Sequence, residues 1–141
     1  MKKSKKIIYA LFLCAACKST DPPTFAGKNW QLTALHTAAG EKVLPEGYGF
    51  NMRFEDGRIS GKGACNYVGF YYQWRYADSL SVFGGDQTDM ASDPELRMTW
   101  DDWFIAEMLK VRALNMPDSN HLELRCNDGG KVFFKQTTQP Q

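Results

Sequence analysis

Histidine is scarce in this sequence, and so are the short motifs that mark enzyme active sites. His36 and His121 are the only histidines among 141 residues, and neither has the His-Glu-x-x-His spacing of a zinc-binding helix. The Gly-x-Ser-x-Gly turn of serine hydrolases is also absent, as are glycine-rich phosphate-binding loops. The acids Asp86, Asp89 and Asp93 lack the spacing of a calcium-binding loop. We therefore expect no catalytic residues, no metal, no cofactor and no enzymatic activity.

Long apolar runs are lacking too, with one exception near the N-terminus. That exception is residues 7–16, which is about half the roughly 20 residues that a membrane-spanning helix needs. It follows a basic stretch at residues 1–6 and ends in small side chains, which is the layout of a secretory signal. We therefore predict that residues 1–16 are a signal peptide that directs export.

The apolar run ends as Leu13-Cys14-Ala15-Ala16-Cys17, which resembles the lipobox of bacterial lipoproteins. The resemblance implies that a lipid is attached to Cys17, that the chain is cut before this residue, and that the new amino terminus is acylated. Cys14 stands where the lipobox usually has an aliphatic residue, so an ordinary signal peptide with a chance cysteine is the alternative. Residues 17–27, which include Pro22-Pro23, are then the lipidated cysteine and a tether. We expect the membrane to be one partner, and the periplasmic face of the outer membrane to be the location.

The charge balance changes once the signal segment is removed. Residues 1–16 contain four lysines and no acids, so 13 basic and 16 acidic residues remain, a net charge of −3. This balance argues against a nucleic-acid partner, which a basic surface would attract. The remaining 125 residues are of the usual size for one domain.

Cysteine is limited to four positions, and only Cys65 and Cys126 lie in the predicted domain. In an oxidising compartment an even pair is a candidate disulfide. Two separate buried thiols are the alternative, because the spacing in sequence does not give the Cα separation that a bridge requires.

Alternation of apolar and polar residues indicates that most of the domain is β-structure. Turn signals at Asp56-Gly57 and at residues 127–130 each connect two alternating segments. Residues 38–49 are predicted to be a loop, and Gly84-Gly85 to end a strand. The predicted strands are 29–36, 50–55, 58–63, 70–76, 80–83, 121–126 and 131–135.

One segment has a helical pattern. Asp93-Pro94 is a typical helix start, and Pro117 marks its end. Between them an apolar stripe recurs at three- and four-residue steps: Leu96, Trp100, Trp103, Phe104, Met108, Val111 and Leu114. The predicted fold class is therefore α+β, a curved antiparallel sheet that forms a partial barrel, with one main helix packed on it.

An aromatic row in the strand at 70–76 is the most prominent candidate for binding. The four aromatic side chains, at every second position, would point to one side of the strand: Phe70, Tyr72, Trp74 and Tyr76. They are expected either to pack in the core or to line a groove that accepts a lipid tail or an apolar segment of a partner.

Several motifs along the chain resemble those of the META domain family, also called HslJ-like. They are Trp30-Gln31-Leu32, the strand at 50–55, the Ser-Gly and Gly-Ala-Cys-Asn elements within residues 59–67, the segment Thr88-Asp89-Met90-Ala91-Ser92, and Leu122-Glu123-Leu124. Ser92 stands where the family commonly has a cysteine. A disulfide between the Gly-Ala-Cys-Asn element and the segment Thr88-Asp89-Met90-Ala91-Ser92 is therefore ruled out. The resemblance places the domain at residues 28–136, with a polar tail at 137–141.

The same resemblance implies a function without an established enzymatic activity. Members are often envelope lipoproteins that are linked to stress tolerance. We therefore expect a non-enzymatic binding module of the cell envelope. The alternatives are a structural accessory subunit that docks on an envelope assembly, and a protein that binds an apolar ligand.

Overall fold

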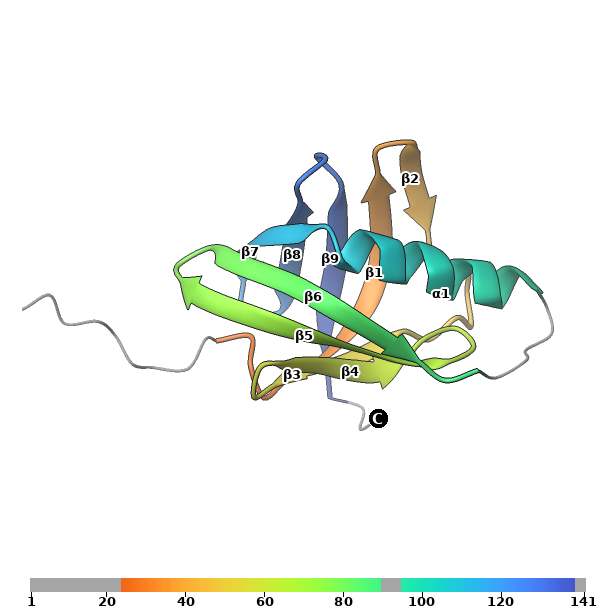
Figure 1. Ribbon diagram of the computed structural model, residues 1–141, viewed down its shortest axis with the longest axis horizontal. Helices are drawn as coiled ribbons and strands as arrows, with labels where there is room; N and C mark the ends of the chain where they lie inside the picture. Colours follow the sequence, from red (N-terminus) through yellow and green to blue (C-terminus); the bar gives the residue numbers. More distant parts are fainter. Residues whose placement is uncertain (1–23, 90–94, 139–141) are drawn as a thin grey trace, which may run out of the picture.

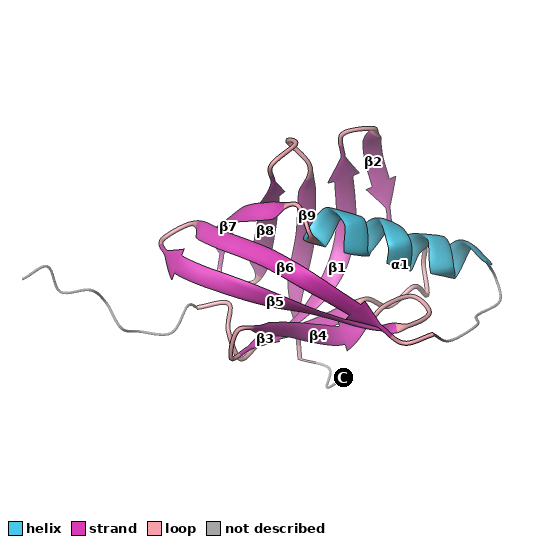
Figure 2. Ribbon diagram, in the orientation of Figure 1, coloured by secondary structure: helices cyan, strands magenta, loops and turns pink. Residues whose placement is uncertain are grey.

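The computed structural model describes residues 24–89 and 95–138. The predicted signal peptide, Cys17 and the predicted helix start at Asp93 lie outside these residues. The described elements are β1 (Asn29–Thr37), β2 (Gly40–Val43), β3 (Asn51–Glu55), β4 (Arg58–Lys62), β5 (Tyr67–Tyr76), β6 (Ser79–Gln87), α1 (Glu95–Met108), β7 (Val111–Asp118), β8 (His121–Cys126) and β9 (Lys131–Thr137) (Figures 1 and 2). Within the described residues, no helix is both long enough and apolar enough to cross a membrane.

The strands form an antiparallel barrel that closes on itself. Neighbours follow the order β1-β3-β4-β5-β6-β7-β8-β9, and β9 pairs back to β1. Eight strands therefore complete the circle, and β2 extends one end of β1 as a short outer hairpin strand. The prediction of an antiparallel sheet with a packed helix is confirmed, but the prediction of a partial barrel is wrong. Local alternation defines single strands, whereas closure depends on pairing between the first and last strands of the domain.

The weakest junction of the barrel lies between β6 and β7. These strands share one residue pair, Ser79 with Ala113, and one flanking hydrogen bond from the Leu114 N–H to the Asp78 carbonyl at 2.8 Å. Helix α1 connects the two strands and contacts β1, β6 and β9. The helix therefore packs on the barrel beside β1, β6 and β9, and in Figure 1 it lies across β1, before the start of β7.

Aromatic side chains fill the interior of the barrel. Phe104 of α1 packs against Phe50, Phe70 and Phe134, with ring centroids 5.0, 5.9 and 6.2 Å apart. Trp30 is fully buried and donates its indole N–H to the Phe25 carbonyl at 2.9 Å. Each such ring removes about 150–250 Å² of surface from water, so these contacts hold the helix on the sheet.

The folded part of the chain includes Phe25. This residue is buried, and its ring packs against Phe54 and Tyr72. A buried aromatic ring belongs to the core, so the folded part includes at least residue 25.

Three other boundaries differ from the sequence predictions. The helix ends at Met108, and Val111 and Leu114 belong to β7, because spacings of three residues also fit the inner face of a strand that contains a bulge. Strand β6 continues through Gly84-Gly85, where Gly84 has a φ of +55° and the pairing with β5 shifts register. Strand β2 was predicted to be loop, because its residues are mostly exposed and show no apolar alternation.

Candidate functional site

The Gly-Ala-Cys-Asn motif forms a loop that binds a carboxylate of the same chain. The backbone N–H groups of Ala64, Cys65 and Asn66 donate to the Asp101 carboxylate at 2.7, 3.0 and 2.7 Å. Asp101 is fully buried in α1, and successive N–H groups of this kind make an anion-binding concavity. Gly63 lies so close that an added Cβ would sit 2.4 Å from Asp101 Oδ1. The motif therefore fastens the helix to the end of β4.

Thr88, the first residue of the segment that ends at Ser92, contacts the Gly-Ala-Cys-Asn loop. The Thr88 hydroxyl donates to the Asn66 side-chain oxygen at 3.2 Å, and it accepts the Tyr67 N–H at 3.1 Å. Ser92 and the rest of that motif beyond residue 89 lie outside the described residues. Both motifs thus stabilise the fold, and their polar groups are directed at each other.

Cys65 and Cys126 are both buried, and no disulfide joins these two described thiols. The Cys65 N–H binds Asp101, whereas the Cys126 thiol donates to the carbonyl of Glu107 at 3.4 Å. Six residues of helix separate those two anchors, which corresponds to about 9 Å along the axis. Disulfides span Cα separations of only about 4.4–6.8 Å, so the candidate bridge is not formed. Burial, reinforced by the charge of Glu107, raises the pKa of the Cys126 thiol to about 12.

The aromatic row of β5 belongs mainly to the core. Phe70 is fully buried, while Tyr72 and Trp74 are half-buried and pack against the core cluster. Tyr76 is 68% exposed at the far end of the strand. Of the two alternatives for the row, Phe70 takes the core position, because its ring packs against Phe104 with centroids 5.9 Å apart. Among the hollows described below, none is lined by the row.

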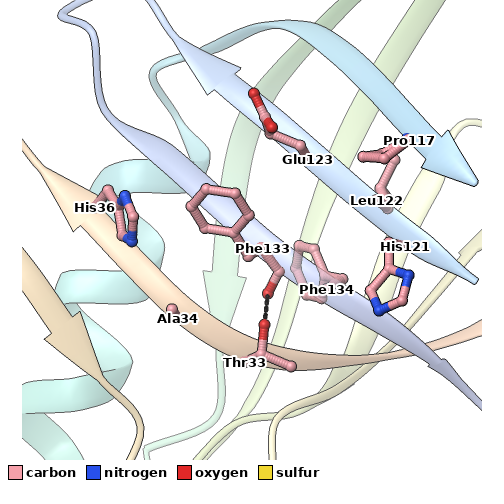
Figure 3. A pocket seen from close by; sticks show the side chains of 9 residues that line it. All are labelled: Thr33, Ala34, His36, Pro117, His121, Leu122, Glu123, Phe133 and Phe134. Atoms are coloured by element: carbon pink, nitrogen blue, oxygen red, sulfur yellow. Dashed lines mark hydrogen bonds between the residues drawn. The ribbon is translucent and has the colours of Figure 1, made fainter.

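A hollow of about 320 Å³ lies on the outer face of β1, β8 and β9 (Figure 3). We call it the Phe133 hollow, after the ring at its centre. A bulge in β1 at Thr33 places the small Ala34 opposite Phe133, and the Thr33 hydroxyl donates to the Phe133 carbonyl at 3.1 Å. Its lining residues are Thr33, Ala34, His36, Pro117, His121, Leu122, Glu123, Phe133 and Phe134.

Both histidines of the chain lie at the Phe133 hollow, on opposite sides of the Phe133 ring in Figure 3. The His36 ring packs on Phe133 with centroids 4.6 Å apart, and its Nε2 lies 3.2 Å from a Glu41 oxygen. His121 Nδ1 lies 2.8 Å from an Asp118 oxygen. The two rings therefore have carboxylate neighbours and form a polar border around an apolar floor.

Glu123 is the acidic group of this border. Its carboxylate accepts from Arg125 Nε at 2.8 Å and lies 3.3 Å from Lys131 Nζ. The hydrogen bond from Arg125, assisted by Lys131, lowers the pKa of Glu123. The charge of Glu123 is thus balanced within the face, and the centre of the hollow is apolar.

The comparisons with known proteins agree with this architecture. The META domain family model matches residues 23–139. The chain belongs to the META domain family. An NMR structure of a protein from Burkholderia xenovorans has a TM-score of 0.67 at 18% identity, over 99% of this chain and 98% of that one. A second NMR structure has a TM-score of 0.51 at 20% identity, over 77% of this chain and 87% of the other. No curated protein matches the sequence.

This META domain also has an aromatic patch that the sequence reasoning missed. On the outer face of β5 and β6, Tyr71 and Phe83 are half-exposed, form a cross-strand pair and stack with centroids 6.1 Å apart. The Arg58 guanidinium lies 5.0 Å from the Tyr71 ring and binds Asp86 at 2.8 Å. We call this the Tyr71–Phe83 patch. The signal was present in the sequence, because Tyr71 alternates with the row in β5 and Phe83 follows the buried Val82 in β6.

The Phe133 hollow of the META domain could not be read from sequence in the same way. Two of its walls come from β1 and β9, whose paired residues Ala34 and Phe133 are far apart in the chain. The bulge at Thr33 has no glycine or other sequence mark that would have indicated it.

Proposed function

We propose that this META-domain chain is a non-enzymatic, lipid-anchored protein of the cell envelope that binds an envelope protein through the Phe133 hollow. The observation that carries the binding proposal is the hollow itself, with an aromatic floor and a border whose charges are already paired. An apolar side chain of a partner can enter such a site without leaving a buried charge unpaired.

The size of the hollow favours a side chain over a lipid. Pockets for small molecules measure about 300–1,000 Å³, so a hollow of about 320 Å³ fits one or two large side chains. The barrel interior is filled by aromatic rings, so an apolar ligand within the barrel is the less favoured alternative. We propose envelope stress tolerance as the process that this binding serves.

The lipid anchor is supported by the Leu13-Cys14-Ala15-Ala16-Cys17 sequence and by the short tether before Phe25. Acylation by two or three chains would hold the domain at the membrane permanently. Such a position suits a binding module, because the module and an envelope partner are then held at the same membrane surface. The periplasmic face of the outer membrane is the proposed location.

The binding proposal is tested by cross-linking in the native envelope, followed by purification and mass spectrometry. Phe133→Ser should abolish capture of the partner that wild type captures, because it removes the floor of the hollow. Phe83→Ser is the matched control, since it removes an equally large ring from a different outer face. Retention of the partner by Phe133→Ser would refute the proposed site.

A second candidate function follows from the Tyr71–Phe83 patch. Stacked aromatic rings beside an arginine are the composition of protein interfaces, so docking as an accessory subunit would use this face. In the same experiment, loss of the partner in Phe83→Ser with retention in Phe133→Ser would identify this alternative.

A further inference from the structure

Glu107, in the last turn of α1, is a buried carboxylate with one unsatisfied oxygen. Its side chain is 5% exposed. Oε1 accepts from the Lys110 ammonium at 2.8 Å, but Oε2 is buried and accepts no hydrogen bond from the described residues. An unsatisfied oxygen of a buried carboxylate is costly, so this atom is a ready ligand for a cation.

Further ligand atoms lie close to the Glu107 carboxylate. The Cys126 thiol at the end of β8, an Asp128 oxygen in the β8–β9 turn and a Glu107 oxygen all lie within 4.8 Å of one another. Gly130 leaves the space beside them open. The position of its missing Cβ is 2.8 Å from Glu107 Oε2, 2.9 Å from the His36 carbonyl and 3.0 Å from Asp128 Oδ1. Oxygens from three segments thus converge on one point.

We propose that Glu107, Cys126 and Asp128 form a binding site for one Zn²⁺ ion. One sulfur and two carboxylate oxygens suit a borderline-soft ion, whereas Ca²⁺ and Mg²⁺ prefer oxygen alone. Zinc would bind these three ligands at about 2.0–2.3 Å, with water in the fourth position. The contraction from the present spacing falls on Asp128, because its side chain is 31% exposed whereas Glu107 and Cys126 are buried.

Lys110 now neutralises part of the charge of the two carboxylates. Its ammonium lies 2.8 Å from Glu107 Oε1 and 3.0 Å from Asp128 Oδ2, so it bridges the same two carboxylates. With the thiol protonated, these groups carry a net charge of −1. When Zn²⁺ enters, the Cys126 proton is released to water and Lys110 moves toward solvent, and the group including Lys110 becomes neutral. The ion therefore removes an uncompensated negative charge beside the buried carboxylate.

The site also has a route to solvent. A hollow of about 300 Å³ includes Glu107 and Lys110 in its lining, together with Trp103 and Lys42. The Lys110 side chain is 37% exposed, so it can leave the carboxylates without disturbing the core. A hydrated ion can therefore reach Glu107 along the path that Lys110 vacates.

The test is a metal titration of the full chain carrying Cys14→Ser and Cys17→Ser, so that only Cys65 and Cys126 can contribute thiolates. Co²⁺ is the optical probe, since its bond to a thiolate gives a charge-transfer band in the near ultraviolet. The band should saturate at one Co²⁺ per chain and disappear when Zn²⁺ displaces the cobalt. Cys126→Ser should abolish it, and Cys65→Ser, the matched buried cysteine, should retain it.

Two variants at partly exposed side chains test the site without the risk that a substitution of the buried Cys126 prevents folding. Asp128→Asn should weaken Zn²⁺ binding about tenfold or more, because it removes one anionic ligand. Lys110→Met should tighten Zn²⁺ binding about tenfold, because the competing ammonium is gone. A band that follows Cys65, the absence of a saturable band, or a Lys110→Met variant that binds no tighter than wild type would overturn the proposal.

Discussion

Replacing Asp101 by asparagine should destabilise the domain strongly without changing its surface. The carboxylate accepts hydrogen bonds from three backbone N–H groups and, at 3.4 Å, from the Asn66 side-chain amide. An asparagine keeps one acceptor oxygen, but it turns an N–H₂ group toward donors at the other position. With its oxygen at the Oδ2 position, which accepts three of the four bonds, the asparagine loses the bond from the Ala64 N–H, whose net contribution is about 1.5–3 kcal/mol. The three remaining bonds weaken as well, because their acceptor is no longer charged.

No water can replace these bonds, because Asp101 is fully buried. Allowing for partial relaxation, we expect the free energy of unfolding to fall by about 3–5 kcal/mol, a large part of the roughly 5–15 kcal/mol of a typical domain. With a urea slope of about 2 kcal/mol per M, the unfolding midpoint should drop by about 2 M. Circular dichroism during urea titration measures this shift.

Asp102→Asn is the matched control for this prediction. Asp102 is the next residue of the same helix and is exposed, so its substitution should change the free energy of unfolding by less than about 0.5 kcal/mol. If Asp101→Asn unfolded within about 1 kcal/mol of wild type, the loop at residues 64–66 would not be what holds the helix, and the structural interpretation of the motif would fail.

Three further predictions concern stability and thiol chemistry. Gly63→Ala should cost about 1–3 kcal/mol in urea unfolding, because its Cβ would meet a carboxylate oxygen at 2.4 Å, whereas Gly49→Ala, with its nearest contact at 3.7 Å, should be mild. Glu123 has a lowered pKa in the folded state, so its contribution is present above about pH 4.5 and is lost as the pH falls through the folded value. Thermal unfolding between about pH 5 and pH 3 should therefore decline less in Glu123→Gln than in wild type, and equal declines would refute this assignment. Cys65 and Cys126 should resist alkylation in native protein and react after denaturation without reductant, whereas a peptide that links them would contradict the structure.

The strands that could be predicted from sequence are those with one clearly apolar face. Segments such as 50–55 and 121–126 alternate strictly, and each is followed by a tight turn, so pattern and turn agree. Strand β7 could not be predicted, because Val111 and Leu114 continue the three- and four-residue steps of the helix before it. Strand β2 failed because it buries almost nothing, and its place is determined by pairing with β1.

The candidate sites were less predictable than the strands, for a physical reason. The Phe133 hollow and the site formed by Glu107, Cys126 and Asp128 are each assembled from segments that only the closed barrel brings together. A single sequence shows which side chains point outward, but it does not show which outward side chains become neighbours. The motif residues 63–66 were visible as a motif, yet their partner Asp101 was not, because a carboxylate on a helix usually faces water.

The pairing of β1 with β9 has a consequence for biosynthesis. A chain that emerges from its N-terminus produces β1 first, and β1 must wait for the last strand before its second edge is covered. During this interval two sheet edges are open, and open edges invite pairing with other chains. A truncation before residue 131 would make this state permanent by leaving β1 and β8 without their shared neighbour. Aggregation, and not a smaller soluble barrel, is then the expected fate of the shortened chain.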